Sequence, residues 1–118
     1  MIVRRIVPNI QTDDPDGCAT FYAQVFGLDR VMDMGWIATM QAATEPGPMQ
    51  LSLASQGGSD TPVPALSIEV DDLETALQRL EALGVQPEYG PVTEPWGVRR
   101  FYVRDPAGTL LNIVTHQS

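Results

Sequence analysis

Three ionisable side chains are the first candidates for chemistry in this sequence of 118 residues. Glu69 lies in an alternating segment, where a half-enclosed carboxylate needs a cation, a hydrogen-bond donor or its own proton. His116, the only histidine, is predicted to be a solvated residue, a hydrogen-bonding group at a strand end or a ligand. Arg99, close to Trp96, would hold a carboxylate or phosphate of a ligand, or pair with Glu69 or Glu94. These side chains can bind a ligand or accept a proton together only if the fold brings them to one face.

The other reactive side chains form no recognised catalytic arrangement. Cys18, the only cysteine, falls beside Phe21 on the apolar stripe of a predicted helix, which favours a buried inert thiol over a nucleophile. The sequence contains no Ser-His-Asp arrangement, phosphate-binding loop or zinc motif. Because a single cysteine can form no internal disulfide, we expect a cytoplasmic protein.

Composition limits the partners that the chain is expected to have. Seven Lys and Arg against fifteen Asp and Glu leave a net charge of −8, so nucleic acid and anionic membranes are not expected to bind. No apolar run approaches the roughly 20 residues that a membrane-spanning helix needs. With 43% hydrophobic and 19% charged residues, the chain is typical of one compact domain, or of two small halves that share a core.

The first half of the chain has the pattern of one strand, one helix and three strands. The helix is predicted to begin after Asp14, an N-cap residue, with Pro15 at its first position, and to end near Phe26 before Gly27. The alternating, strand-like runs are residues 1–11, 28–34, 36–42 and 49–54.

The same order recurs after a polar linker, residues 55–64. A strand is predicted over 65–70 and a helix from Leu73, after the capping pair Asp71-Asp72, to about Gly84. Three further strands are predicted over 85–89, 98–103 and 110–116. Identical or similar residues recur at an offset of 57, which indicates duplication: Asp14 and Asp71, Ala19 and Ala76, Gly27 and Gly84, Leu28 and Val85. We therefore predict an α+β fold of two βαβββ modules, residues 1–54 and 65–118.

Two such sheets, each with a helix on its outer face, are predicted to leave concave faces that enclose a ligand site. Strand alternation points polar side chains into this concavity, and loop position adds Trp96, for which a protein interface fits equally well. The predicted cavity residues are Asn9, Gln50, Ser67, Glu69, Trp96, Arg99, Asn112 and His116. Each alone is also typical of a hydrogen-bonded interior group, but together they predict a polar, selective cavity.

Two motifs within the paired halves resemble those of a known family. They are TFYAQVFGL, residues 20–28, and RDPAGTLLN, residues 104–112. In their order and spacing the whole chain resembles the glyoxalase, bleomycin-resistance and extradiol-dioxygenase superfamily, also called vicinal oxygen chelate proteins. The resemblance implies two curved, partly open, barrel-like mixed sheets with helices on the outer face, and a homodimer.

Metal-dependent members of that family hold a divalent ion with four side chains, typically His and Glu, from the first and last strands of each half. On this chain those positions fall at Val7, Gln50 or Ser52, Ala65 and Asn112. None of them is a His or a carboxylate, and a hard divalent ion needs anionic or imidazole ligands to offset its dehydration. We therefore expect no metal cofactor.

The sequence thus predicts a protein that binds a small polar organic molecule without a metal, similar in principle to the antibiotic-sequestering members of the family. The net negative charge favours a cationic ligand. The alternative is a glyoxalase-like lyase or isomerase, or a dioxygenase, whose displaced metal is held by Glu69, Gln50 and His116. A third hypothesis is a subunit that acts only through protein contacts, which a filled concavity would support.

Overall fold

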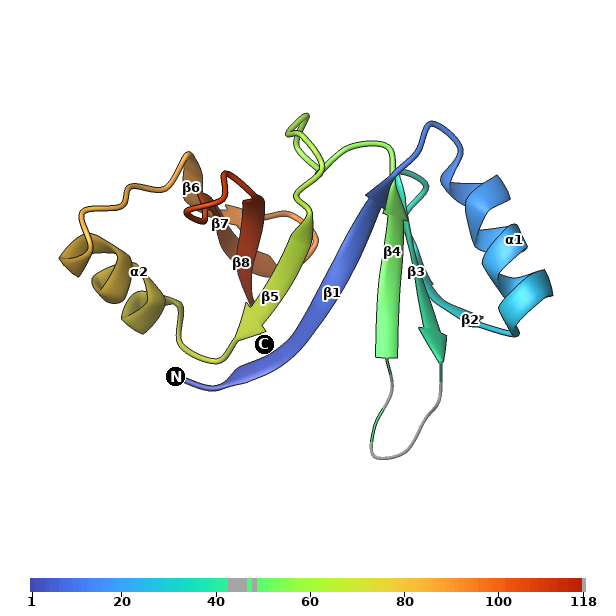
Figure 1. Ribbon diagram of the computed structural model, residues 1–118, viewed down its shortest axis with the longest axis horizontal. Coiled ribbons are helices and arrows are strands. Elements are labelled where there is room, and N and C mark those ends of the chain that lie inside the picture. The colour runs from blue at the N-terminus through green and yellow to red at the C-terminus, as the bar shows by residue number, and fades with distance from the viewer. Residues whose placement is uncertain (43–46, 48, 118) are drawn as a thin grey trace. The chain divides into compact units, whose positions relative to one another are not determined.

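The computed structural model describes residues 1–42, 47 and 49–117, and its element order is βαβββ followed by βαβββ (Figure 1). The elements are β1 (Val3–Gln11), α1 (Pro15–Phe26), β2 (Asp29–Asp33), β3 (Ile37–Ala42), β4 (Met49–Ala54), β5 (Leu66–Val70), α2 (Leu73–Ala82), β6 (Tyr89–Glu94), β7 (Val98–Arg104) and β8 (Leu110–His116). The predicted α+β class and the repeated order of elements are confirmed. Within the described residues, neither helix is long and apolar enough to span a membrane.

The chain divides into two compact units that share β1. The N-terminal unit is Val7–Val63, and the C-terminal unit combines Met1–Ile6 with the chain from Pro64 onward. The first four residues of β1 therefore belong to the C-terminal unit, and the rest of the strand belongs to the N-terminal unit. The segment 55–64, predicted as a linker, lies almost entirely in the N-terminal unit.

In the N-terminal unit, the strand order is β2-β3-β4-β1, with β1 parallel to β4 and the other pairs antiparallel. Helix α1 packs on one face of these strands through Ala19, which contacts a buried cluster of Ala38, Met40 and Leu53. The helix begins where the Asp14 side chain accepts a hydrogen bond from the Gly17 N–H, 3.0 Å away. Its predicted start at Pro15 and end at Phe26 are confirmed.

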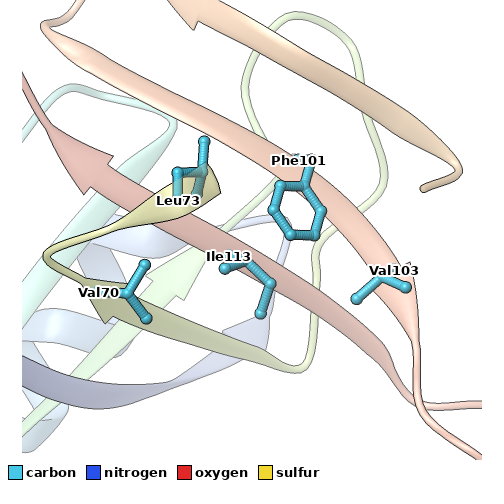
Figure 2. Close-up of a cluster of buried hydrophobic side chains, with 5 residues drawn as sticks. All are labelled: Val70, Leu73, Phe101, Val103 and Ile113. Atoms are coloured by element: carbon cyan, nitrogen blue, oxygen red, sulfur yellow. The ribbon is translucent and has the colours of Figure 1, made fainter. Parts of the chain in front are cut away.

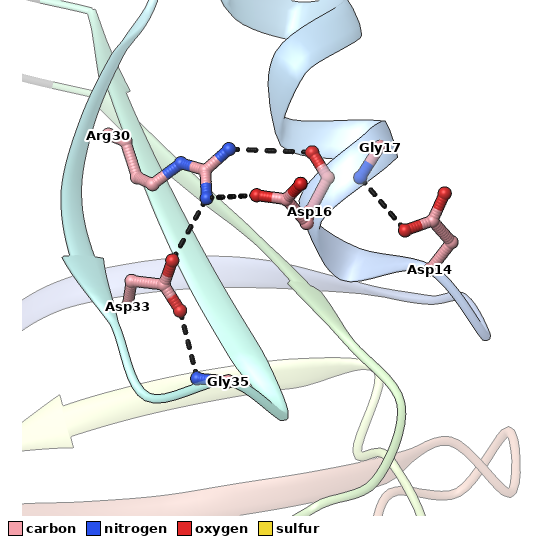
Figure 3. A network of polar contacts seen from close by, with 6 residues as sticks. All are labelled: Asp14, Asp16, Gly17, Arg30, Asp33 and Gly35. Carbon is pink, nitrogen blue, oxygen red and sulfur yellow. Dashed lines mark hydrogen bonds and ion pairs between the residues drawn. The ribbon is translucent and has the colours of Figure 1, made fainter.

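An exposed ionic network joins the start of α1 to β2 (Figure 3). Arg30 donates to the Asp16 carboxylate at 2.7 Å and to the Asp33 carboxylate at 2.9 Å. The backbone N–H of Gly35 also donates to Asp33, and these two hydrogen bonds lower the pKa of the Asp33 carboxyl. The network ties β2 to the first turn of α1. None of its residues was predicted to line the cavity.

In the C-terminal unit, β5 pairs in parallel with β8, and β7 pairs antiparallel with both β8 and β6. The side chains of Val70, Leu73, Phe101, Val103 and Ile113 form the buried cluster between these strands and α2 (Figure 2). The helix begins at Leu73, and its N-cap is Asp72, the second residue of the predicted capping pair, whose side chain accepts the Thr75 N–H.

The sixth strand is the one element that the sequence misplaces, since it was predicted over 85–89 and lies at Tyr89–Glu94. Val85 instead closes the end of α2, where its N–H donates to the Leu80 carbonyl at 3.0 Å. The strand then needs Gly90, which has a φ of +78°. A Cβ at Gly90 would lie 2.6 Å from the Arg100 carbonyl oxygen, so only glycine lets β6 approach β7 this closely.

Candidate functional site

The C-terminal unit presents a face of its sheet that α2 does not cover. The residues that alternate with the buried cluster point to this side, because successive side chains of a strand face opposite ways. We call this side the polar face, and it comprises Ser67 and Glu69 of β5, Arg100 and Tyr102 of β7, and Asn112, Val114 and His116 of β8. The structure thus places four of the predicted cavity residues together: Ser67, Glu69, Asn112 and His116.

Asn112 lies at the centre of this face with one of its two amide functions unused. It pairs across the sheet with Ser67 on one side and Tyr102 on the other. Its Nδ2 donates to Ser67 Oγ at 3.1 Å, and the whole residue is only 8% exposed. Its Oδ1 is buried without a hydrogen-bond partner among the described residues. A buried acceptor left unpaired costs about 1–3 kcal/mol, so this position favours a molecule that donates a hydrogen bond.

Arg100 is the buried cation of the polar face, at 3% exposure. Its Nη2 and Nε lie 2.6 and 2.7 Å from the Glu94 carboxylate, and its Nη1 donates to Tyr102 Oη at 2.9 Å. The rings of Tyr89, Trp96 and Tyr102 surround the guanidinium, with centroids 5.5, 5.1 and 4.9 Å from Cζ. The carboxylate also accepts from Tyr89 Oη at 2.9 Å. These contacts fix Trp96 and both tyrosines around a neutral ion pair.

The predicted ion pair of Arg99 with Glu69 or Glu94 is wrong. Arg99 lies on the opposite side of β7 from Arg100, and its guanidinium is 4.0 Å from Glu74 on α2. Neither Glu69 nor Glu94 is its partner, since Glu94 pairs with Arg100. Alternation along β7 separates the two arginines correctly, but it cannot say which of them meets a tryptophan in the preceding loop.

Glu69 lies at one end of the polar face, between two basic groups. Arg5 of β1 donates from Nε to Oε1 at 2.6 Å, and His116 Nδ1 lies 2.8 Å from Oε2. Partial burial tends to raise the pKa of this carboxyl, but the hydrogen bonds from Arg5 and His116 outweigh it and lower the pKa below its ordinary value of 4.5. Glu69 is therefore an ionised carboxylate with both oxygens engaged.

Sequence reasoning missed Arg5, although a usable signal was present. Val7 and Asn9 were assigned to the same face of the first strand, and counting back two residues along that strand reaches Arg5. Tyr89 and Glu94 were missed as partners of Arg100 because they lie on the strand that the sequence misplaced.

The N-terminal unit carries a polar row of its own, on the side of its strands away from α1. The buried hydroxyls of Thr39 and Ser52 are 2.7 Å apart, and Asn9 pairs with Ser52 across the parallel strands. Gln50 donates from Nε2 to Gln41 Oε1 at 2.7 Å. The two residues weighed for the metal position, Gln50 and Ser52, therefore share one face, and both hydrogen-bond to β3.

The donor set does not fit the metal of the metal-dependent family members. The positions that the resemblance assigns hold Val7, Gln50, Ala65 and Asn112, and the described residues contain no group of three or more His, Cys, Asp or Glu that could hold an ion. The displaced set also fits poorly, since both oxygens of Glu69 are engaged by Arg5 and by the imidazole of His116.

Comparison with known proteins agrees with this architecture. The Glyoxalase/Bleomycin resistance protein/Dioxygenase superfamily profile matches residues 3–113, and the chain belongs to this superfamily. No curated protein sequence matches it.

Solved structures similar to this chain share its fold at low sequence identity. The structure described as an NAD-dependent benzaldehyde dehydrogenase from Legionella pneumophila has a TM-score of 0.72 and 16% identity, covering 96% of this chain and 100% of that one. Methylmalonyl-CoA epimerase from Streptomyces coelicolor gives 0.66 and 16%, covering 98% and 97%. A superfamily member from Vibrio splendidus 12B01 gives 0.63 and 19%, covering 95% and 97%. At such identities the similarity concerns the fold, and the activity has to be argued from the site.

Proposed function

We propose that this protein binds a small polar organic molecule on the polar face of its C-terminal unit, without a metal ion. The observation that carries the proposal is the buried Oδ1 of Asn112, which no described group satisfies. Its amide nitrogen is committed to Ser67, so the amide is held in place with its acceptor unused. A ligand hydroxyl or N–H at this oxygen would remove the cost of the unpaired group.

The charges of the polar face favour a neutral ligand, although the chain as a whole carries −8. Arg100 is paired with Glu94, Arg5 with Glu69, and the neighbouring Arg104 of β7 with Glu88 at 2.6 Å. Because the opposite charges within each of these pairs offset one another, we expect the face to attract a cation only weakly, in contrast to the expectation from net charge. Recognition then rests on hydrogen bonds rather than on charge.

The proposal can be tested with pairs of small fragments that differ in one hydrogen-bond donor. Alcohols and primary amides would be compared with their methyl ethers and N,N-dimethyl amides by saturation-transfer NMR on the wild-type protein and on Asn112→Leu. The donor-bearing members should bind the wild type alone, because only they can satisfy Asn112 Oδ1. Thr115→Val, on the same strand but facing the other way, is the matched control and should bind as the wild type does. Equal binding of donor-free fragments, or undiminished binding by Asn112→Leu, would refute the proposal.

The expected homodimer and cytoplasmic location belong to the same proposal. Support for a dimer comes from α1, where Phe21, Val25 and Phe26 are 54, 58 and 63% exposed although they are large and apolar. A second copy of the chain is the occupant we propose for this surface. Light scattering at micromolar concentration should give about twice the 12.9 kDa chain mass, and a clean monomer would contradict it. Cys18, the single cysteine, supports the location.

A further inference from the structure

His116 is held more firmly than a residue at the end of the last strand would suggest. Its backbone pairs with Val98 of β7, and the pairing continues one residue further, where the N–H of Gln117 donates to the Gly97 carbonyl at 2.8 Å. The side chain is 52% exposed and is fixed through Nδ1 by Glu69. The imidazole therefore has a defined orientation at an accessible edge of the polar face.

The hydrogen bond to Glu69 determines which ring nitrogen carries the proton. An ionised carboxylate only accepts hydrogen bonds, so His116 Nδ1, at 2.8 Å, must be the donor. In the neutral ring the lone pair then lies on Nε2. No described residue forms a hydrogen bond with Nε2. The half-exposed ring thus presents a proton acceptor that no described residue uses.

Arg5 explains why this arrangement is more than an ion pair between Glu69 and a charged histidine. The guanidinium of Arg5 already neutralises the carboxylate through Oε1, at 2.6 Å. The second oxygen, Oε2, is left to orient the imidazole, and Glu69 does not need the positive charge of His116 as its counterion. A third group that orients a base is the arrangement by which proteins hold an imidazole ready to take a proton.

We propose that His116 Nε2 is a general base on the polar face, acting on a hydroxyl group of the bound molecule or of a water beside it. The proton moves from the hydroxyl to Nε2 while the electron pair stays on oxygen, which becomes a nucleophile. The imidazolium that forms is stabilised by Glu69, and the step needs neither a metal nor an oxidant. The class of substrate rests on the proposed function, because a hydroxyl is also a hydrogen-bond donor that Asn112 Oδ1 could accept from. The pairing of Glu69 with His116 does not depend on the proposed function.

The protonation pattern of the His116 ring can be measured without any ligand. Because the chain has one histidine, its imidazole ¹⁵N signals need no assignment. Two-dimensional ¹⁵N NMR of the imidazole at alkaline pH should show an unprotonated Nε2 in the wild type. In Glu69→Leu the ring should revert to the Nε2–H form that free imidazole favours, whereas Glu69→Gln, which keeps an acceptor oxygen, should retain the wild-type form. An Nε2–H tautomer in the wild type would overturn the proposal. Amide spectra of each variant would verify that it is folded.

Reactivity is tested with 4-nitrophenyl acetate and water as the probe. His116 takes a proton from water, the oxygen bonds to the acetyl carbon, 4-nitrophenolate leaves, and the proton returns to solvent. The protein-dependent rate should fall about tenfold or more in His116→Gln and several-fold in Glu69→Leu, with Thr115→Val as the unchanged control. A wild-type rate in His116→Gln would overturn the proposal. Fragment binding tests the role of Asn112 in the proposed function, whereas the tautomer tests the pairing of Glu69 with His116. The binding hypothesis and the general-base hypothesis can therefore fail independently of each other.

Discussion

The buried ion pair between Arg100 and Glu94 gives the sharpest test of how the polar face is built. Both side chains are 4% exposed and lie 2.6 Å apart. We consider Arg100→Met, Glu94→Gln and the double variant. Arg100→Met removes the cation from among the rings of Tyr89, Trp96 and Tyr102, and takes its positively charged partner from the Glu94 carboxylate, to which the Tyr89 hydroxyl still donates. Glu94→Gln keeps the volume but leaves the guanidinium without its carboxylate.

The expected magnitude follows from the desolvation of the partner that remains. Breaking a buried pair by removing one member costs about 3–5 kcal/mol, because the other charge stays buried and uncompensated. The Tyr102 hydroxyl and the aromatic rings still contact Arg100 in Glu94→Gln, so we expect about 3 kcal/mol there, at the low end. The double variant removes both charges, so its loss should be smaller than the sum by about 2 kcal/mol or more. These losses are large against a total stability of about 5–15 kcal/mol.

Urea unfolding measures these free energies, with tryptophan fluorescence and far-ultraviolet circular dichroism as independent probes of the same transition. Trp96 lies against Arg100, so its emission should also change in the native state of Arg100→Met. Single variants that lose less than about 1 kcal/mol would show that water reaches the pair. Strictly additive losses would show that the two charges do not interact, and either result would refute the reasoning.

Three further predictions concern the backbone, pH and metal ions. Gly90→Ala should destabilise the fold by about 3 kcal/mol or more, because its Cβ would lie 2.6 Å from the Arg100 carbonyl oxygen. The matched control is Gly97→Ala, which is also at positive φ but in open space and should lose about 1–2 kcal/mol in the same unfolding assay. The folded-state pKa of Glu69 lies below its ordinary 4.5, so the contribution of the ionised carboxylate to folding stability is present above pH 4.5 and is lost as pH falls through the lowered value. The difference in unfolding free energy between the wild type and Glu69→Gln should therefore be constant above pH 4.5 and shrink below it. A difference that does not change with pH would contradict the paired carboxylate. Calorimetric titration with Zn²⁺, Ni²⁺ or Mn²⁺ should show no site tighter than about micromolar, and a nanomolar site would contradict the ligand-set argument.

Local signals predicted the elements well where their boundaries are set by nearby residues. The start of α1 depends on Asp14 and Pro15 and its end on Gly27, all within one turn of the boundaries, and both ends were predicted correctly. The sixth strand depends on pairing with β7, which no property of residues 85–94 specifies. The capping aspartates differ by 58 residues, Asp14 and Asp72, whereas the counted offset of 57 matched Asp14 to Asp71.

Alternation predicted which side chains share a face, but not which groups become partners. Ser67 and Asn112 were placed on one face and do form a hydrogen bond across the parallel strands. Arg5 and Glu69 are 64 residues apart, and their contact depends on how β1 meets β5, which the sequence pattern leaves open. The identity of a charged partner is a long-range property, whereas the face of a strand residue is a local one.

The charge balance of the polar face adds a second argument that the residues present do not fit the family's metal and do fit the neutral ligand proposed above. A divalent ion needs net negative charge from its ligands, and here Glu94 and Glu69 are each neutralised by an arginine at hydrogen-bond distance. A cation placed beside Asn112 would have only a neutral amide oxygen as ligand from the position where the resemblance puts a His or Glu. A hydrogen-bond donor needs no such charge, because one amide oxygen at a fixed position is already a complete partner for it. The same residues that make the face unsuitable for a metal thus make it suitable for a neutral, hydroxyl-bearing molecule.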